Sequence, residues 1–229
     1  MLTNLDFKSH PYLIPIDKNT DVFNSFVVSM EAKYLKEVLG SNLYNAFKNG
    51  LYSLPGLYSE TVATVIGQQY VYKNDVWEAL TVTTGTLPIE GGDWTLIELG
   101  NRWLRLKNGD RYLISDKYYE WVGFIEALKP LIYSLWIDIP ELTSNGIVIP
   151  TSENSRRGDP SQIICNNWNI WAREVGSECE VYNTLYGYLY YVNLNDQTFD
   201  DTFDETFTSF NEYLNYSFRS QDRKNVFGI

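Results

Sequence analysis

The hydrophobic period of this chain changes twice, because an alternating segment at residues 67–115 is flanked on both sides by helical spacing. Within it, QYVYKNDVWEALTV and RWLRLKNGDRYLIS each predict a β-hairpin, the second around Asn108-Gly109, a pair preferred in type I′ turns. A β segment of roughly 50 residues is small enough to depend on its host for stability. The sequence therefore predicts an α+β fold. A mostly α-helical bundle of residues 1–66 and 116–229 carries an inserted antiparallel β minidomain at 67–115.

The N-terminal helical segment predicts two helices that meet at a glycine. Apolar residues recur at helical spacing over 19–39, and Gly40 follows as the residue that ends this helix. Ser41 then caps a second, shorter helix that continues to about residue 51. We expect these two helices to form a hairpin or an elbow.

The C-terminal half predicts further helices. Helical spacing returns at 115–137, where Pro130 predicts a kink or a break. A segment at 138–158 that is rich in Pro, Gly, Ser and Asn predicts a loop or a short hairpin. Asp159 then caps the longest predicted helix, which runs approximately from Ser161 to Val192.

The composition limits the partners of the chain. Its net charge of −11 argues against gripping a DNA duplex and against binding an anionic membrane surface, although an acidic wall could surround DNA and leave it free to slide. Aromatic residues make up 16% of the chain and predict extensive partner contacts. The sequence shows neither an apolar run of the ~20 residues that a membrane span needs nor a signal peptide, which predicts cytoplasmic synthesis. Cys165 and Cys179 are too few for a disulfide scaffold or a zinc site.

Catalytic signatures are missing from the sequence. His10 is the single histidine, and no phosphate-binding glycine loop or zinc-hydrolase motif is present. Acidic residues near Asp93 could in principle form a glycosidase pair, but they are interpreted as solvated hairpin residues. The acids at 200–205 lack the spacing and the glycine of a calcium loop. We therefore expect no enzyme activity, no cofactor and no metal.

Two groups of residues are candidates for protein contacts. The first is a basic patch on the second predicted hairpin, which could meet an acidic neighbour or another copy of the chain, or could simply be solvated. It consists of Arg102, Arg105, Lys107 and Arg111. The second is an apolar stripe with helical spacing in the C-terminal tail, which is typical both of a segment docking in a partner's groove and of a last helix that closes a core. Its members are Phe199, Phe203, Phe207, Phe210, Leu214 and Phe218.

One short stretch, YVYKNDVWEALTVTTGTLPIEGGDW, resembles the small carbohydrate-binding modules appended to chitinases. In that family exposed aromatic rings stack on sugar faces. The resemblance implies a candidate glycan platform of Tyr72, Trp77 and Trp94. It gives the alternative function, which is a carbohydrate-binding surface or tail-associated protein.

Two longer stretches are similar to another family. SMEAKYLKEVLGSNLYNAF and ALKPLIYSLWIDIPELTSNGIVIPTSENS resemble the head–tail connector (adaptor, or neck) proteins of tailed bacteriophages. The nearest likeness is to those of phages that infect Bacteroidetes, including crAss-like phages. The β minidomain departs from a minimal, all-helical connector.

The resemblance implies a structural virion protein at the head–tail junction, made in the host cytoplasm. Such a subunit would form a closed ring of about twelve copies. The ring would bind the portal protein on one side and the next neck or tail protein on the other. Genome DNA would pass through the ring without specific binding, and no membrane would be involved.

Overall fold

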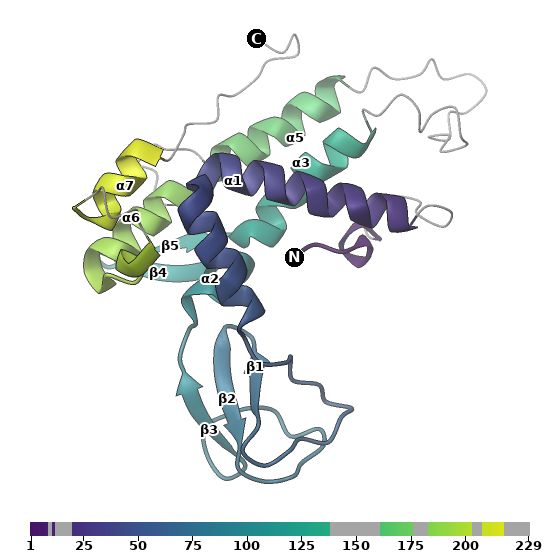
Figure 1. The fold of residues 1–229 in the computed structure, drawn as a ribbon, viewed down its shortest axis with the longest axis vertical. Helices are drawn as coiled ribbons and strands as arrows, with labels where there is room; N and C mark the ends of the chain where they lie inside the picture. Colours follow the sequence, from purple (N-terminus) through teal and green to yellow (C-terminus); the bar gives the residue numbers. More distant parts are fainter. Residues whose placement is uncertain (9–10, 12–19, 138–160, 176–182, 203–207, 218–229) are drawn as a thin grey trace.

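The computed structural model describes residues 1–8, 11, 20–137, 161–175, 183–202 and 208–217. Helices form most of the regular structure, and a three-stranded and a two-stranded antiparallel sheet accompany them. This confirms the predicted α+β class. Figure 1 shows the helices gathered in one body, with the three-stranded sheet extending from it toward the lower end of the long axis.

Helix α1 (Thr20–Tyr52) bends at Gly40, which has φ 73° and ψ 168°. A residue in this conformation interrupts the helical hydrogen-bond ladder, so the predicted elbow between two helical arms is confirmed. The buried side chains of both arms recur at helical spacing and face the core. The second arm leads directly to the β minidomain (Figure 1).

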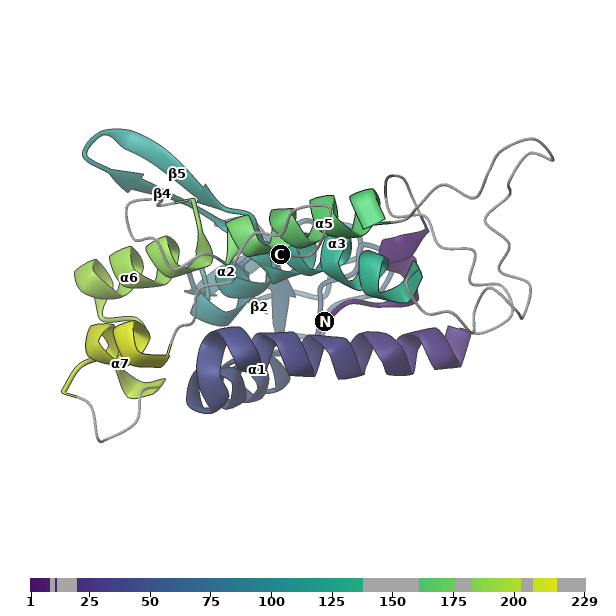
Figure 2. The same cartoon turned by 90° about the horizontal axis from the view of Figure 1, so that it is seen from above.

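Helix α3 (Gly123–Ile137) lies at the centre of the body and is apolar on most sides, as expected of a buried helix. It continues through Pro130, whose carbonyl accepts a hydrogen bond of 2.6 Å from the Ser134 hydroxyl. Helix α5 (Ser161–Glu174) packs along α3 more extensively than any other described element does. Figure 2 shows α3 and α5 side by side, with the first arm of α1 beneath them.

The prediction of one long helix from Ser161 to Val192 is wrong. Helix α5 is followed by a separate helix, α6 (Leu185–Asp196), which has its own N-cap. Thr184 is extended at φ −95° and ψ 162°, and its hydroxyl accepts a hydrogen bond of 3.2 Å from the Gly187 amide. Periodicity alone does not reveal this start, because the apolar spacing continues on both sides of it.

The tail also differs from the predicted continuous helix. Asp200–Thr202 forms a short 3-10 helix, η2, and helix α7 (Phe210–Ser217) begins only at Phe210. The Thr202 hydroxyl donates to the Phe199 carbonyl at 2.7 Å, and the Asn193 side-chain oxygen accepts from the Phe199 amide at 2.7 Å. These local bonds fold the chain back from α6, so that α7 packs against α6 and α1.

Aromatic rings hold the helical body together. Phe7, from the N-terminal 3-10 helix η1 (Asn4–Phe7), lies edge-on to Phe23 at 5.2 Å between ring centroids. Phe23 in turn lies edge-on to Trp136 of α3 at 4.8 Å. Such edge-to-face pairs add about 0.5–1.5 kcal/mol to the effect of area burial. The core therefore joins η1, α1 and α3 directly.

The three-stranded sheet comprises β1 (Gln69–Tyr72), β2 (Asp75–Ala79) and β3 (Trp94–Glu98), in the order β1-β2-β3. Tyr72 pairs with Asp75, so Lys73 and Asn74 form the two-residue turn of the first predicted hairpin, and Lys73 has a positive φ of 56°. This hairpin is confirmed. All three strands lie inside the predicted minidomain segment.

The second predicted hairpin is wrong in its position. Residues 102–108 form helix α2 (Arg102–Asn108), and the hairpin follows as β4 (Asp110–Ile114) and β5 (Lys117–Trp121). The Asn101 side chain caps α2 by accepting from the Trp103 and Leu104 amides at 3.0 and 3.2 Å. Gly109, with φ 100°, ends α2 instead of turning a hairpin. The actual turn lies at Ser115-Asp116, where both residues have positive φ, so the prediction of a helix over 115–137 is wrong for residues 117–121, and the helix begins at Gly123.

Candidate interaction surfaces

The turn of β1 and β2 joins the three-stranded sheet and its loops to the helical body, which includes α2 and the β4–β5 hairpin; from here on the minidomain means residues 53–99. The Asn74 side chain donates to the Gly109 carbonyl at 3.1 Å and accepts from the Asn108 side chain at 2.9 Å. The Asn101 amide donates to the Asn74 carbonyl at 2.7 Å. A small apolar cluster of Val71, Val76 and Leu104 closes the same joint. The opposite end of the strands, which carries the loops 53–68 and 80–93, therefore points away from the body (Figure 1).

The rings of the candidate glycan platform form the interior of the minidomain. Trp94 is 2% exposed and Trp77 is 7% exposed. Tyr58 lies edge-on to Trp94 at 5.4 Å, and the Trp94 indole nitrogen donates to the Thr86 carbonyl at 3.1 Å. Tyr72 is half-buried and lies edge-on to Tyr58 at 5.9 Å. These rings are core residues, so the expectation of an exposed sugar-stacking platform is wrong for Trp77 and Trp94.

A buried threonine joins the two loops at the free end of the minidomain. The Thr64 amide donates to the Thr83 carbonyl at 2.9 Å, and the Thr83 amide donates back to the Thr64 hydroxyl at 2.9 Å. The Thr64 hydroxyl also lies 3.1 Å from the Thr81 carbonyl, to which it donates. The loops 53–68 and 80–93 therefore behave as one surface.

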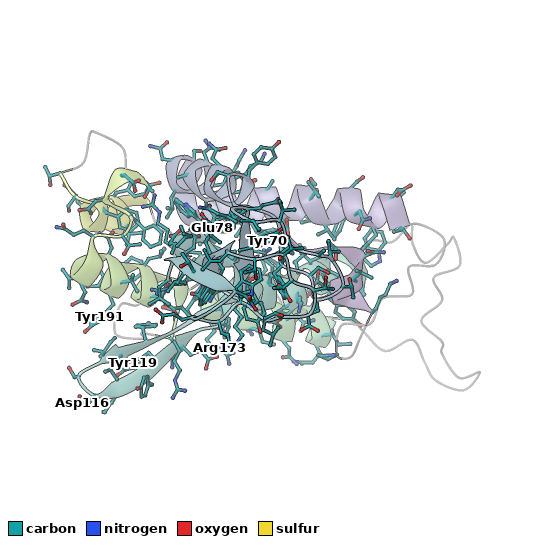
Figure 3. The ribbon with its side chains drawn as sticks, turned by 90° about the horizontal axis from the view of Figure 1, so that it is seen from below. Tyr70, Glu78, Asp116, Tyr119, Arg173 and Tyr191 are labelled. Carbon is teal, nitrogen blue, oxygen red and sulfur yellow. The ribbon has the colours of Figure 1, made fainter. Side chains whose placement is uncertain are left out.

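This surface carries exposed aliphatic side chains. Most of the large hydrophobic residues that are exposed in the described part of the chain lie between residues 52 and 99. We define the aliphatic tip by the exposed residues next to the Thr64 bonds, which are Val62, Val65, Ile66, Leu80 and Val82. The charged residues of the segment 53–99 are mostly acidic. Lys73 is its one basic residue, and its acidic residues are Glu60, Asp75, Glu78, Glu90, Asp93 and Glu98. Figure 3 views the molecule from this end, with Tyr70 and Glu78 in the sheet behind the loops.

The basic patch is divided between α2 and β4, and much of it has partners within the chain. Arg102 forms a two-pronged ion pair with Asp201, with nitrogen–oxygen distances of 2.7 and 2.8 Å, and it also donates to the Thr198 carbonyl. The hydrogen bonds from Arg102 hold the pKa of Asp201 below its ordinary value. A guanidinium nitrogen of Arg105 lies 3.6 Å from a carboxylate oxygen of Asp110.

Arg111 is exposed, whereas Lys107 is half-buried like Arg102 and Arg105. The guanidinium of Arg111 lies over the Tyr118 ring at 4.3 Å. Lys107 lines a groove against α1. The four basic residues therefore do not form one free patch, and Arg102 in particular joins α2 to the tail of the same chain.

The phenylalanine stripe divides in a similar way. Phe199, Phe210 and Leu214 are buried in the main core, with the Phe199 and Phe210 rings stacked at 5.4 Å. The Phe199 ring also lies 5.7 Å from the Trp103 ring. These three residues close the core of their own chain, so they are not an exposed docking face. Phe203, Phe207 and Phe218 lie outside the described residues.

An apolar groove lies in the inner angle of α1, and we call it the elbow groove. Its volume is about 440 Å³. Most of its lining is apolar, and its charged side chains are Lys48, Lys107 and Glu31, the last of which is paired with the Met1 amine at 3.0 Å. Tyr52 at the end of α1 lines it while being 93% exposed. The buried acid of this region, Glu31, accepts from the Leu2 amide at 2.6 Å.

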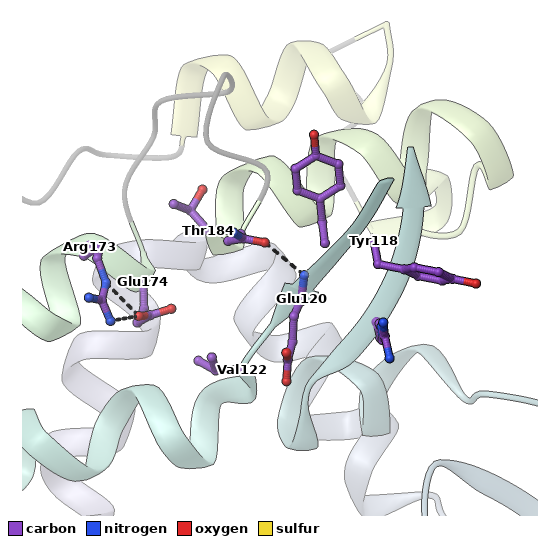
Figure 4. Close-up of a pocket in the computed structure, with 9 residues that line it drawn as sticks. Tyr118, Glu120, Val122, Arg173, Glu174 and Thr184 are labelled. Atoms are coloured by element: carbon purple, nitrogen blue, oxygen red, sulfur yellow. Dashed lines mark hydrogen bonds and ion pairs between the residues drawn. The ribbon is translucent and has the colours of Figure 1, made fainter. Parts of the chain in front are cut away.

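A larger hollow of about 770 Å³ lies between the β4–β5 hairpin and the facing ends of α5 and α6 (Figure 4). Arg173 in its lining donates to the Glu174 carboxylate at 2.6 and 3.0 Å, and the backbone amide of Glu120 donates to the Asn183 side chain at 3.0 Å. Among the described residues that line it, none is a histidine, a cysteine or a serine. The described part of this lining offers hydrogen bonds to a ligand and shows no nucleophile held by a base.

The described part of the chain shows neither a candidate metal site nor a candidate membrane span. No group of three or more His, Cys, Asp or Glu side chains within the described ranges could hold a metal ion. Cys165 is buried and its sulfur accepts a hydrogen bond of 3.7 Å from the Asn169 side chain, while Cys179 and His10 lie outside the described residues. None of the described helices is long and apolar enough to cross a membrane.

Comparisons with protein-family models, with curated proteins and with solved structures find no match to this chain. Sequence reasoning missed the aliphatic tip, because its residues lie in loops without a helical or alternating period. The available signal was compositional: the stretches ETVATVIG and LTVTTGTLPI combine aliphatic residues with threonine and contain no basic residue. Such loops are too apolar to be ordinary solvated turns.

Proposed function

We propose that this chain is a structural virion protein, a subunit of the head–tail connector ring of a tailed bacteriophage. The observation that carries the proposal is the aliphatic tip, which belongs to an acidic minidomain standing out from the helical body. An exposed apolar surface of this kind is typical of a protein that works through contacts with other proteins. The class of assembly comes from the resemblance to neck proteins.

The arrangement of the resembling segments supports the proposal. Residues 29–47 form the two arms of α1 around Gly40, and residues 127–137 belong to α3. Both segments contribute buried residues to one core, among them Leu35 and Phe47 of α1 and Leu128 and Leu131 of α3. The two resembling stretches therefore build one structural unit. Residues 138–155 of the second stretch lie outside the described residues.

The charge of the chain is suited to a passage for DNA. A ring of subunits that each carry −11 repels phosphates from its inner wall, so a duplex slides without being held. The contacts that matter in such a protein are with other copies, with the portal protein and with the next neck or tail protein. The alternative of a carbohydrate-binding protein loses its main support, because Trp77 and Trp94 are buried.

Immunogold electron microscopy of virions of the phage that encodes this chain tests the proposal. Antibody raised against the chain is expected to label the junction of head and tail, and prior incubation of the antibody with purified chain should abolish the label. Label at fibres or over the capsid exterior would overturn the connector assignment and revive the carbohydrate-binding alternative. Absence of the chain from purified virions would also overturn it.

A further inference from the structure

We propose that the aliphatic tip of one copy docks in the elbow groove of a second copy of this chain. The inference rests on the proposed function, because it names the contact by which ring subunits would join. Tip and groove are different surfaces of the molecule, so the contact is heterologous. A heterologous contact repeats from copy to copy and closes into a ring when the rotation between copies allows it.

The tip has the shape and chemistry of a docking element. Its five aliphatic residues are exposed on two loops that the Thr64 and Thr83 bonds hold together, so the surface is pre-organised before it meets a partner. Trp94, buried behind the loops, supports them through its hydrogen bond to Thr86. A docking contact would cover apolar side chains that the monomer leaves in water.

The tip cannot reach the groove of its own copy. Asn74 fixes the turn end of the strands to Asn108 and Gly109 at the helical body. The tip lies at the other end of the same strands, away from α1 (Figure 1). The groove is lined by α1 and by Lys107 of α2, close to the root of the minidomain. A tip that occupies this groove must therefore belong to another molecule.

Charge complementarity identifies this other molecule as a second copy. The groove is apolar along Val28, Ala32 and Leu35. Glu31 also lines it but is paired with the Met1 amine at 3.0 Å, so the lysines Lys48 and Lys107 leave the groove positive. The tip is aliphatic, and the nearest charged residues in its loops are the acids Glu60, Glu90 and Asp93. An apolar centre with opposite charges around it fits the pattern of a specific protein contact. An anionic membrane would be repelled by the same acids.

Charge placed in the tip tests the contact. Val65→Asp in the full chain would bury a carboxylate in the groove and is expected to weaken self-association on the order of a hundredfold, measured by sedimentation velocity over a concentration series. Val22→Asp is the matched control, because Val22 and Val65 are 58% and 57% exposed and Val22 lies on the first arm of α1, outside both surfaces. Thermal unfolding of both variants checks that they remain folded.

A mixing experiment then tests that the contact joins tip to groove. The double variant Lys48→Glu/Lys107→Glu retains its tip but reverses the charge of the groove, and is expected to associate on the order of tenfold more weakly than the wild type. Val65→Asp retains its groove. A mixture of the two variants should form a complex of two molecules that grows no further, since only one intact tip and one intact groove can meet in it.

The outcomes separate this inference from the proposed function. If Val65→Asp assembles like the wild type, or if the mixture does not form the two-molecule complex, the contact is wrong. A wild-type chain that stays monomeric at every concentration also overturns it. The connector assignment survives these results when antibody still labels the head–tail junction. A Val65→Asp chain that self-associates normally but fails to bind portal protein would reassign the tip to that partner.

Discussion

The hydroxyl of Tyr213 donates a hydrogen bond of 3.1 Å to the carbonyl of Leu39, far away in the sequence. It also accepts a hydrogen bond of 3.5 Å from the amide of Leu43. These two backbone groups flank Gly40, where α1 bends and its own ladder cannot satisfy them. A side chain of the last described helix therefore completes the hydrogen bonding of the elbow.

Tyr213→Phe is expected to destabilise the fold by about 1–3 kcal/mol, because it leaves buried backbone groups at the elbow without a partner. The free energy of unfolding from urea titration measures the loss. Tyr190→Phe is the control, since it removes a tyrosine hydroxyl from the same body and no hydrogen bond of that hydroxyl is described. Equal stability of the two variants would show that water satisfies the Leu39 and Leu43 groups.

Gly40→Ala tests the backbone of the same elbow. The conformation at φ 73° and ψ 168° is sterically allowed for glycine alone, and other residues there are strained by roughly 1–3 kcal/mol. We expect a loss of that order in the free energy of unfolding. Gly56→Ala is the control, because a Cβ at Gly56 meets nothing within 4 Å and its φ is not in the left-handed region. A Gly40→Ala protein as stable as the wild type would mean that the elbow can straighten without penalty.

The sequence was sufficient to predict the elbow and the first hairpin, because each is encoded locally. Gly40 follows a long helical period, and Lys73-Asn74 separates two alternating runs. Helix α2 was missed because seven residues with Trp103, Leu104 and Leu106 on the buried side fit both a short helix and a strand pair. The deciding contact is the cap supplied by Asn101.

The alternating pattern of the strands could not predict which side chains of the minidomain are buried and which are exposed. Alternation places Tyr70, Trp77 and Leu96 on the same face of the sheet, but it does not show what covers that face. The cover comes from Tyr58 and from the Thr86 carbonyl, which lie in loops without a period. The same loops turn their own aliphatic residues to solvent. Burial here is decided by contacts between distant segments, which a local pattern does not contain.

The free energy of unfolding is expected to depend on pH through the carboxyl group of Asp110. Burial raises its pKa above the ordinary value of 3.8, although Arg105 and the hydrogen bond from Tyr188 act in the opposite direction. The folded state therefore binds this proton more tightly than the unfolded state does. The contribution of Asp110 to stability falls as the pH rises from about 3.8 through the folded-state pKa, and is constant above it.

Asp110→Asn should remove this trend. The difference in unfolding free energy between variant and wild type is expected to shift in favour of the variant as the pH rises from about 3.8, then to level off. Urea titrations at a series of pH values measure the difference. Asp116→Asn, at the exposed hairpin turn, shows whether loss of one negative charge alone produces the effect. A difference that does not change with pH would contradict the raised pKa of Asp110.

Gly123 and Gly109 allow two backbone segments to cross at the base of the β4–β5 hairpin. A Cβ on Gly123 would lie 2.4 Å from the Gly109 nitrogen and from the Asn108 carbonyl carbon, and Gly123 has φ 87°. Gly123→Ala is therefore expected to lower the free energy of unfolding by more than about 3 kcal/mol. The alanine would be strained at this positive φ, and the backbone at Asn108-Gly109 would also have to move to make room for its Cβ. Gly91→Ala is the matched control: its φ of 115° is also positive, but nothing lies within 4 Å. The difference between the two variants isolates the collision from the strain. If both lose the same amount, the crossing at Gly109 is looser than these distances require, and the hairpin is free to move on the body.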